Sequence, residues 1–391
     1  MMQGSLKLGK LAGIDIRVHY TWFFAFVLIA WSLALGYFPT ANAGLGAGTY
    51  WVLGVVSALL LFGSVLVHEL GHSLVAGARG IRVDSITLFI FGGVSNITKE
   101  ASTARDEFLI AVVGPVTSLV LAGLFWLIAQ VLPAGTALSA VASYLAFTNL
   151  LLGAFNIVPG FPLDGGRVLR SILWGTTGDM GRATRIASYV GQGVAFIMIA
   201  WGASRLLAGD VFGGLWTAFI GWFLNSGAES SRQQLTVHNA LDGVPVSTVM
   251  DTSPTVAEPS LSVHDFVFEH TLRHGHRALP VVEGGRLVGI VSITDAKHLP
   301  HDAWATTPVG EVMTRMPLKT LVPEADLSAA LELMVANGVH QLPIVRDGAL
   351  VGMLSRSDVM RYMQLGAELN LRGSAGSNAA PAESRVAPSR G

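Results

Sequence analysis

Residues 51–77 read WVLGVVSALLLFGSVLVHELGHSLVAG. This apolar run is long enough to cross a bilayer, which takes about 20 residues of helix. It nevertheless contains His68, Glu69 and His72, and ionisable residues inside a membrane span are costly and mark functional sites. Their H-E-x-x-H spacing puts two histidines on one helix face, where both can bind one metal ion. Glu69 is displaced around the helix and is free to act as a base on water that the metal activates.

The composition is that of a membrane protein with a soluble part. Of its 391 residues, 51% are hydrophobic and only 13% are charged, and a chance H-E-x-x-H would seldom fall in a charge-free span of such a chain. The net charge of −1 gives no indication of a nucleic-acid partner. Because the chain has no cysteine, disulfides are excluded and a zinc site must use histidine and carboxylate ligands.

Six segments are predicted to cross the lipid bilayer as helices, forming a membrane domain over residues 20–226 after a cytoplasmic leader, residues 1–19. The six segments are residues 20–38, 51–77, 107–132, 138–160, 187–208 and 211–226. Lys and Arg gather in the segments on one side, so the positive-inside rule predicts cytoplasmic N- and C-termini. We therefore expect a multi-pass protein of the cell (inner or plasma) membrane.

Residues 80–98 differ from the spans. They are rich in β-branched and aromatic residues around Gly92-Gly93, which predicts a membrane-associated β-hairpin. The strand around Ser85–Phe91 could pair with an extended substrate peptide. A purely structural hairpin is the alternative.

Two histidines leave a zinc site short of a third protein ligand. Asp164 is the best candidate, because it follows a helix-breaking Pro-Gly-Phe-Pro-Leu stretch on the same side of the membrane as His68. Its alternative role is to cap a helix over 167–174. Asn156, eight residues earlier, could donate a hydrogen bond to a substrate carbonyl or oxyanion, or make an interhelical hydrogen bond.

From about residue 244 the chain becomes soluble in character and contains an internal repeat. Gly289-Ile-Val-Ser-Ile-Thr-Asp295 recurs as Gly352-Met-Leu-Ser-Arg-Ser-Asp358, 63 residues later and without a gap. Such a repeat predicts two packed copies of one α/β fold, residues 244–300 and 308–366. A linker, residues 227–243, precedes them. The Ala/Ser/Gly/Pro-rich tail, residues 367–391, is predicted to be disordered.

The HELGH sequence and the stretch NIVPGFPLDGG at 156–166 together resemble the site-2 protease family of intramembrane zinc metalloproteases, of the M50 type. Gly92-Gly93 and Gly114-Pro115 fit the same pattern. Ser118 departs from it, because many relatives have Asn at that position. No PDZ-like insertion interrupts the spans, so the branch of the family with C-terminal cystathionine-β-synthase (CBS) domains is the closer match.

This resemblance implies regulated intramembrane proteolysis, the hydrolysis of peptide bonds in a membrane-spanning protein substrate. It implies one Zn²⁺ per chain, held by His68, His72 and Asp164. Glu69 would then be the general base, and Asn156 would steady the oxyanion.

The repeat resembles a tandem pair of CBS domains. The resemblance implies regulation by ATP, ADP or AMP and a homodimer formed through these domains. The nucleotide-contact residues that it implies are Gly289, Ser292, Asp295, Gly352, Ser355 and Asp358, with phosphates met by basic residues such as Arg277, Arg356 or Lys297. A dimerisation module without a ligand is the alternative.

A CBS-gated metal or ion transporter is the competing function. The H-E-x-x-H pattern with a catalytic type of glutamate, and the single visible metal site, favour the protease. A catalytically idle scaffold is disfavoured because His68, Glu69, His72 and Asp164 are all present.

Overall fold

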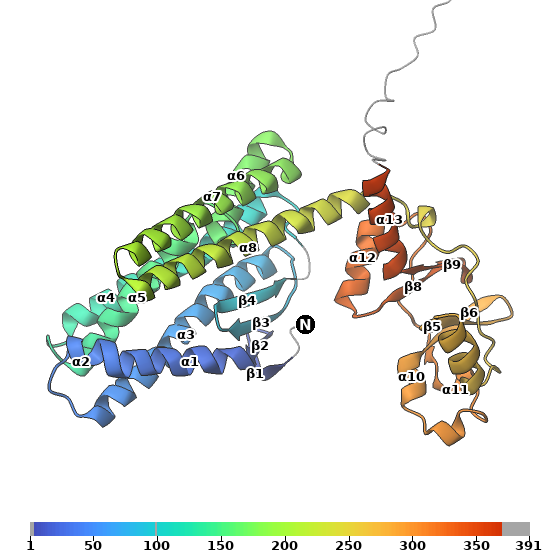
Figure 1. Cartoon of the computed structure of the whole chain (residues 1–391), viewed down its shortest axis with the longest axis horizontal. Coiled ribbons are helices and arrows are strands. Elements are labelled where there is room, and N and C mark those ends of the chain that lie inside the picture. The colour runs from blue at the N-terminus through green and yellow to red at the C-terminus, as the bar shows by residue number, and fades with distance from the viewer. Residues whose placement is uncertain (1–3, 98–99, 370–391) are drawn as a thin grey trace, which may run out of the picture. The chain divides into compact units, whose positions relative to one another are not determined.

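The computed structural model describes residues 4–97 and 100–369 (Figure 1). The chain divides into two compact units, Met1–Leu235 and Thr236–Gly391. Five helical segments of the described residues are long and apolar enough to cross a membrane: Tyr20–Ala41, Ala47–Ala78, Ala104–Val131, Ala137–Ile157 and Met180–Leu207.

The predicted sixth span lies in α8 (Val211–Leu241), which is not among these five. Its apolar part is short, because Asn225 interrupts it and the ion pair of Glu229 and Arg232 follows on the same helix. The rest of α8 covers most of the predicted linker. The structure therefore shows five candidate spans in the described residues and not the six expected. The first unit is nevertheless multi-pass, as predicted.

Apart from Ala47–Ala78, these spans begin with a side chain that caps the first helical turn. The Thr103 side chain accepts a hydrogen bond from the Asp106 amide at the start of α4 (Ala104–Val131), and Thr136 does the same for Ser139 at the start of α5 (Ala137–Ile157). Such caps satisfy amides that the first helical turn leaves unpaired. Helix α3 (Ala47–Ala78) contacts α4, α5 and α1 (Tyr20–Ser32). The helix that carries the HELGH sequence is thus central in its unit.

A four-stranded sheet lies against α3 in the order β1-β2-β3-β4 (Figure 1). Its strands are β1 (Ser5–Leu11), β2 (Ile14–His19), β3 (Val83–Phe89) and β4 (Gly92–Ile97). The predicted hairpin is thus formed by β3 and β4, although Gly92-Gly93 opens β4 instead of forming the turn. The leader unexpectedly supplies two strands, with β2 pairing in parallel with β3.

One expectation about this sheet is wrong. The strand around Ser85–Phe91 cannot take a substrate peptide, because β3 pairs with β2 along one edge and with β4 along the other. Among the described strands, β4 pairs only with β3 and forms the outer edge. The edge next to the HELGH helix therefore belongs to β4.

After α5 the chain continues into α6 (Asp164–Thr177), which packs on α4 and on α7 (Met180–Leu207). The two glycines after Asp164 permit this close approach. A Cβ on Gly165 would lie 2.3 Å from the carbonyl oxygens of Ile157 and Val158, and one on Gly166 would lie 2.4 Å from the Gly160 backbone. The Asp-Gly-Gly sequence is thus required for α6 to begin directly against the end of α5.

The second unit has the repeated architecture that the sequence predicts. Its sheet has the order β5-β6-β9-β8, with β7 (Thr314–Arg315) on β6. The hairpin β5 (Ala278–Glu283) and β6 (Arg286–Ser292) leads into α10 (Ile293–Lys297). The equivalent hairpin, β8 (Gln341–Arg346) and β9 (Ala349–Ser355), leads into α13 (Arg356–Glu368). Each half has its own apolar core, one around Phe266 and Val291 and the other around Leu327 and Leu354.

The remaining helices are short. They are α2 (Phe38–Ala41), α9 (Val263–Asp265), α11 (Val309–Val312) and α12 (Leu327–Ala336), with π-helical segments at Leu33–Tyr37 and Phe266–Arg273. Residues 370–391, most of the tail predicted to be disordered, lie outside the described residues.

Candidate metal centre

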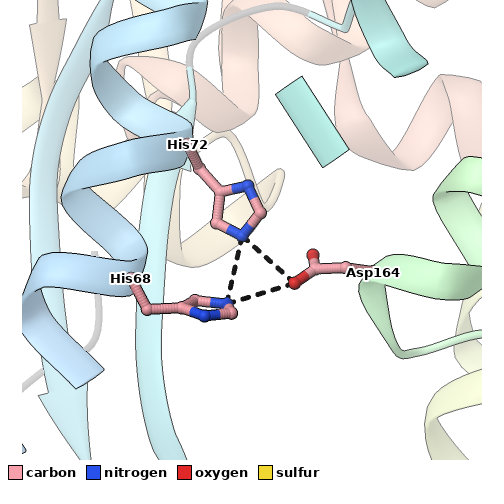
Figure 2. A group of neighbouring side chains, drawn as sticks. All are labelled: His68, His72 and Asp164. Carbon is pink, nitrogen blue, oxygen red and sulfur yellow. Dashed lines mark hydrogen bonds and ion pairs between the residues drawn. The ribbon is translucent and has the colours of Figure 1, made fainter. Parts of the chain in front are cut away.

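Three side chains converge, two from the C-terminal half of α3 and one from the start of α6. The Nε2 atoms of His68 and His72 lie 3.2 Å apart, and Asp164 Oδ2 lies 3.2 Å from the first and 3.1 Å from the second (Figure 2). Both histidines are 4% exposed. One ligand atom from each residue lies within 4.8 Å of the others. Two imidazole nitrogens and one carboxylate oxygen form the donor set of a catalytic zinc site, which uses three protein ligands.

The far side of each imidazole is held by α4. The carbonyl of Ile110 can only accept, so the Nδ1–H of His72 donates to it over 2.6 Å. This fixes the tautomer in which the Nε2 of His72 carries no proton and is available to a metal ion. Nδ1 of His68 lies 2.8 Å from Ser118 Oγ. The residue that departs from the family pattern therefore contacts a candidate ligand.

Gly114 explains why α4 can come so close. A Cβ at this position would lie 2.1 Å from His72 Nε2 and 2.7 Å from His68 Nε2. Any larger residue would occupy the space toward which the three donor atoms point. The donor set, the fixed tautomer and this open space all fit a zinc ion.

Asp164 is the first residue of α6 and not its cap, because Leu163 occupies the N-cap position. The alternative role of capping a helix over 167–174 is therefore not seen, since the helix begins three residues earlier. The helix start, close against the end of α5, is what directs the carboxylate toward the histidines.

Glu69 contacts strand β4 of the sheet and is not one of the three converging side chains. Its Oε2 accepts a hydrogen bond of 2.8 Å from Ser95 Oγ on β4. Gly93, also on β4, is so close that a Cβ there would lie 2.4 Å from Glu69 Cγ. Strand β4 thus holds the carboxylate of Glu69 in place. Ser95 could not be identified from the sequence, because its partner Glu69 lies 26 residues away along the chain.

Replacement of Ser95 tests this contact. We expect Ser95→Ala to lower kcat by about tenfold or more with zinc content unchanged, because a hydrogen bond to a charged group contributes roughly 1.5–3 kcal/mol. Ser95→Thr should restore most of the rate. The measurement is steady-state cleavage of a single-span substrate in liposomes. Ser226→Ala is the control, because among the described contacts that hydroxyl donates to the Trp222 carbonyl of its own helix and to no other group. Equal rates in Ser95→Ala and wild type would refute the role.

Asn156 lies near the end of α5 and is partly exposed. Its amide donates to the Leu152 carbonyl of its own helix over 3.0 Å. Among the described contacts it has none with His68, His72 or Asp164. A different asparagine, Asn149, is fully buried and donates to Ser64 on α3.

The second unit contains a pocket of about 750 Å³ between its two halves. The predicted nucleotide residues Ser292, Asp295 and Ser355 line it, together with Arg277, Lys319 and Arg356. The sequence singled out Lys297, which is exposed and is not among the described lining residues, and overlooked Lys319.

The other predicted nucleotide residues have packing roles. A Cβ on Gly289 would lie 2.5 Å from Met313 Sδ, and one on Gly352 would lie 2.8 Å from the Asp251 carbonyl. Asp358 accepts a hydrogen bond from the Ser355 amide in a capping box, as Asp295 does from Ser292. The repeated Gly-x-x-Ser-x-x-Asp motif therefore builds the turn from strand to helix in each half.

The chain is similar to known proteins over both of its units. Peptidase family M50 matches residues 56–134 and 130–200, and the CBS domain matches residues 246–302 and 309–365. Rip3 of Mycobacterium tuberculosis, named "Putative zinc metalloprotease", is 38% identical over 93% of this chain and 94% of its own length. The protein sll0528 of Synechocystis, with the same description, is 34% identical over 94% of this chain and 97% of its own.

A solved structure, the site-2 protease from Methanocaldococcus jannaschii, is 29% identical and covers 58% of this chain and 95% of that chain, with a TM-score of 0.42. The relatives match nearly the whole chain, membrane unit and CBS pair together. The chain therefore belongs to peptidase family M50 and is a multi-pass intramembrane zinc metalloprotease with two CBS domains.

Proposed function

We propose that His68, His72 and Asp164 hold one zinc ion per chain at the active site of this protease. The observation that carries the proposal is the convergence of two Nε2 atoms and one Oδ2 atom within 4.8 Å of one another. Zinc, when bound, polarises the scissile carbonyl and makes water acidic enough to deprotonate near neutral pH. The decisive experiment compares zinc content and cleavage in variants of Asp164 and Glu69, as set out in the Discussion.

The proton transfers are assigned to Glu69. It is the one residue of the HELGH sequence with an ionisable side chain that is not among the three converging groups. As general base it takes a proton from the attacking water and then passes it to the leaving amine. The hydrogen bond from Ser95 keeps its Oε2 in one orientation during both steps. Asn156 is assigned to the oxyanion, for which its amide must leave the Leu152 carbonyl.

The substrate is proposed to be a membrane-spanning protein that pairs with the outer edge of β4. A peptide bond inside a helix is shielded, so the substrate must be locally extended before hydrolysis. Strand β4 offers unpaired backbone groups along that edge among the described residues, and its Gly93 and Ser95 contact Glu69. A peptide added there lies beside the general base.

The distribution of Lys and Arg supports cytoplasmic N- and C-termini. Termini on the same side require an even number of crossings, so this orientation assigns a sixth crossing to the apolar first part of α8, in addition to the five apolar helices. With this orientation the CBS pair lies in the cytoplasm, where adenine nucleotides are available to it. A homodimer through the CBS pair is proposed from the resemblance of the second unit to tandem CBS domains. The competing transporter function is disfavoured, because relatives that match more than nine-tenths of the chain are named as metalloproteases.

The CBS pocket is proposed to bind ATP, ADP or AMP and to regulate cleavage. Its lining carries the cations Arg277, Lys319 and Arg356 against the single carboxylate of Asp295. A surplus of positive charge favours a phosphorylated ligand over a neutral nucleoside. The volume of about 750 Å³ is within the range typical of small-molecule sites.

Titration calorimetry of the full-length protein tests the pocket. We expect ATP to bind, and Lys319→Gln to weaken binding by about tenfold or more, because it removes a charge-assisted contact to phosphate. Lys297→Gln is the matched control, since this lysine does not line the pocket among its described residues. Heat of binding absent for ATP, ADP and AMP alike would leave the pair as a dimerisation module.

A further inference from the structure

Glu107 is a fully buried acid in the first turn of α4. Its Oε1 accepts a hydrogen bond of 2.6 Å from the Nε of Arg170, whose Nη2 binds the same oxygen. The Nε of Arg167 lies 4.0 Å from that oxygen. Oε2 is buried and has no hydrogen-bond partner within the described part of the chain. A carboxylate that is removed from water in this way depends on its ion pair.

Arg170 belongs to α6, the helix that begins with Asp164. Its side chain is only 12% exposed. Besides Glu107 it contacts Phe161, with Cζ 5.3 Å from the ring centroid. Phe161 is itself buried in a cluster with Ala187 and lies three residues before Asp164. Arg170 therefore fixes both the body of α6 and the segment that leads into it.

Glu107 belongs to α4, the helix whose residues contact the Nδ1 atoms of His68 and His72. The Ile110 carbonyl, one turn after Glu107, accepts from His72, and Gly114 and Ser118 lie next in line along the same helix. The positions of the imidazoles are thus set relative to α4. The position of the aspartate is set by α6. The Glu107–Arg170 pair joins these two helices.

We propose that Glu107 and Arg170 are positioning residues that hold Asp164 at bonding distance from the same zinc ion as His68 and His72. The inference rests on the proposed ligand set. A zinc–oxygen bond is about 2.0–2.2 Å long, so a shift of α6 by a fraction of an ångström removes the aspartate from its place among the ligands. The pair acts on the site through the two helices, because its described contacts include none with His68, His72 or Asp164.

A purely structural role makes a different prediction. A pair that only stabilises the fold lowers the melting temperature of the metal-free protein and leaves the affinity for zinc unchanged. A positioning pair weakens zinc binding beyond any change in the metal-free protein. Zinc affinity, measured beside metal-free stability, separates the two roles without reference to activity.

The experiment uses the full chain purified in detergent. Zinc dissociation constants are measured by competition with a chromophoric chelator for wild type, Glu107→Gln and Arg170→Lys, with metal-free melting temperatures alongside. We expect the dissociation constant to rise about 10–100-fold in both variants, the range typical of partners that orient metal ligands. Lys keeps the charge of Arg170 but lacks its planar fork, so the second variant decides the matter if the first does not fold.

Asp210→Asn is the matched control. It breaks the Arg205–Asp210 ion pair between α7 and α8, which contacts none of the metal-site residues among the described interactions. Zinc affinity equal to wild type in both Glu107→Gln and Arg170→Lys, or weakened no more than in Asp210→Asn, would overturn the inference and leave the metal centre intact. A wild-type protein that binds no zinc would instead overturn the metal centre itself.

Discussion

Glu69→Gln is expected to abolish cleavage of a membrane-spanning substrate while the protein keeps its zinc. Glutamine has the same shape, and its carbonyl oxygen can still accept the hydrogen bond from Ser95, so the contacts between α3 and β4 persist. It cannot take a proton from water or return one to the leaving amine. General acid–base catalysis contributes about 10²–10⁴-fold to rate, so we expect a loss of at least two orders of magnitude in kcat.

The measurement is kcat for a single-span substrate in liposomes, with zinc content determined by elemental analysis of the same preparation. Glu229→Gln is the matched control, because it makes the same chemical change in an acid on α8 that bonds Arg232 on the same helix and Gln192 on α7. A Glu69→Gln variant that cleaves within tenfold of wild type would show that another group moves the proton.

Asp164→Asn is expected to lose zinc, and cleavage with it. Asparagine keeps the size of the side chain but removes the charge that offsets the metal, leaving two neutral imidazoles as protein ligands. Loss of a residue that only orients a metal ligand typically weakens metal binding by about 10–100-fold. Loss of the ligand itself should raise the zinc dissociation constant by more than that. Because ligand binding stabilises the folded state, the rise in melting temperature that zinc causes should disappear as well.

The zinc dissociation constant and the zinc-dependent melting temperature are measured together in the full chain. Asp179→Asn is the control, since Asp179 caps the next helix, α7, through a hydrogen bond to the Arg182 amide. Retention of zinc by Asp164→Asn at wild-type affinity would remove Asp164 from the ligand set and require a different third ligand.

The convergence of His68, His72 and Asp164 in the candidate metal centre could be predicted from the sequence because its signals are local. Two histidines four residues apart on an apolar helix share a face whatever surrounds that helix. Asp164 is a candidate from the sequence because it follows a helix-breaking stretch on the same side of the membrane as His68. The structure adds that the two glycines after Asp164 bring α6 against the end of α5, which directs the carboxylate toward His68 and His72.

The sheet could not be predicted in full, because its pairing is long-range. Strand β2 is a short alternating segment near the N-terminus, and its partner β3 lies almost 70 residues later. No local pattern predicts that pairing, so the expectation that the strand around Ser85–Phe91 could pair with a substrate peptide is wrong, and the free edge belongs to β4. The same limit applies to Ser95, whose contact with Glu69 depends on the register of β4.

The residues that support the site had weak signals of their own. Glu107 opens a predicted span, where an acid is costly unless paired, and Arg167 and Arg170 follow Asp164 by three and six residues. Only the packing of α6 on α4 brings them together. Gly114 was noted as part of a Gly-Pro pair, but its reason, the space for two imidazoles, is visible only in three dimensions.

The repeat in the second unit was readable because it is gapless, yet the motif within it has more than one physical purpose. The glycines relieve a close approach to Met313 and to the Asp251 backbone, and the aspartates cap helices. Only the structure shows which basic residues line the pocket: Lys319 is among the described lining residues and Lys297 is not.

The most direct test of a zinc-dependent reaction with Glu69 as its base is cleavage of a single-span substrate by wild-type protein that has been stripped of metal with a chelator and then given back zinc. We expect no cleavage by the stripped protein and recovery as zinc reaches one ion per chain, with no recovery in Glu69→Gln although it takes up the same zinc. Cleavage that persists in the metal-free protein, or that Glu69→Gln regains with zinc, would contradict this expectation.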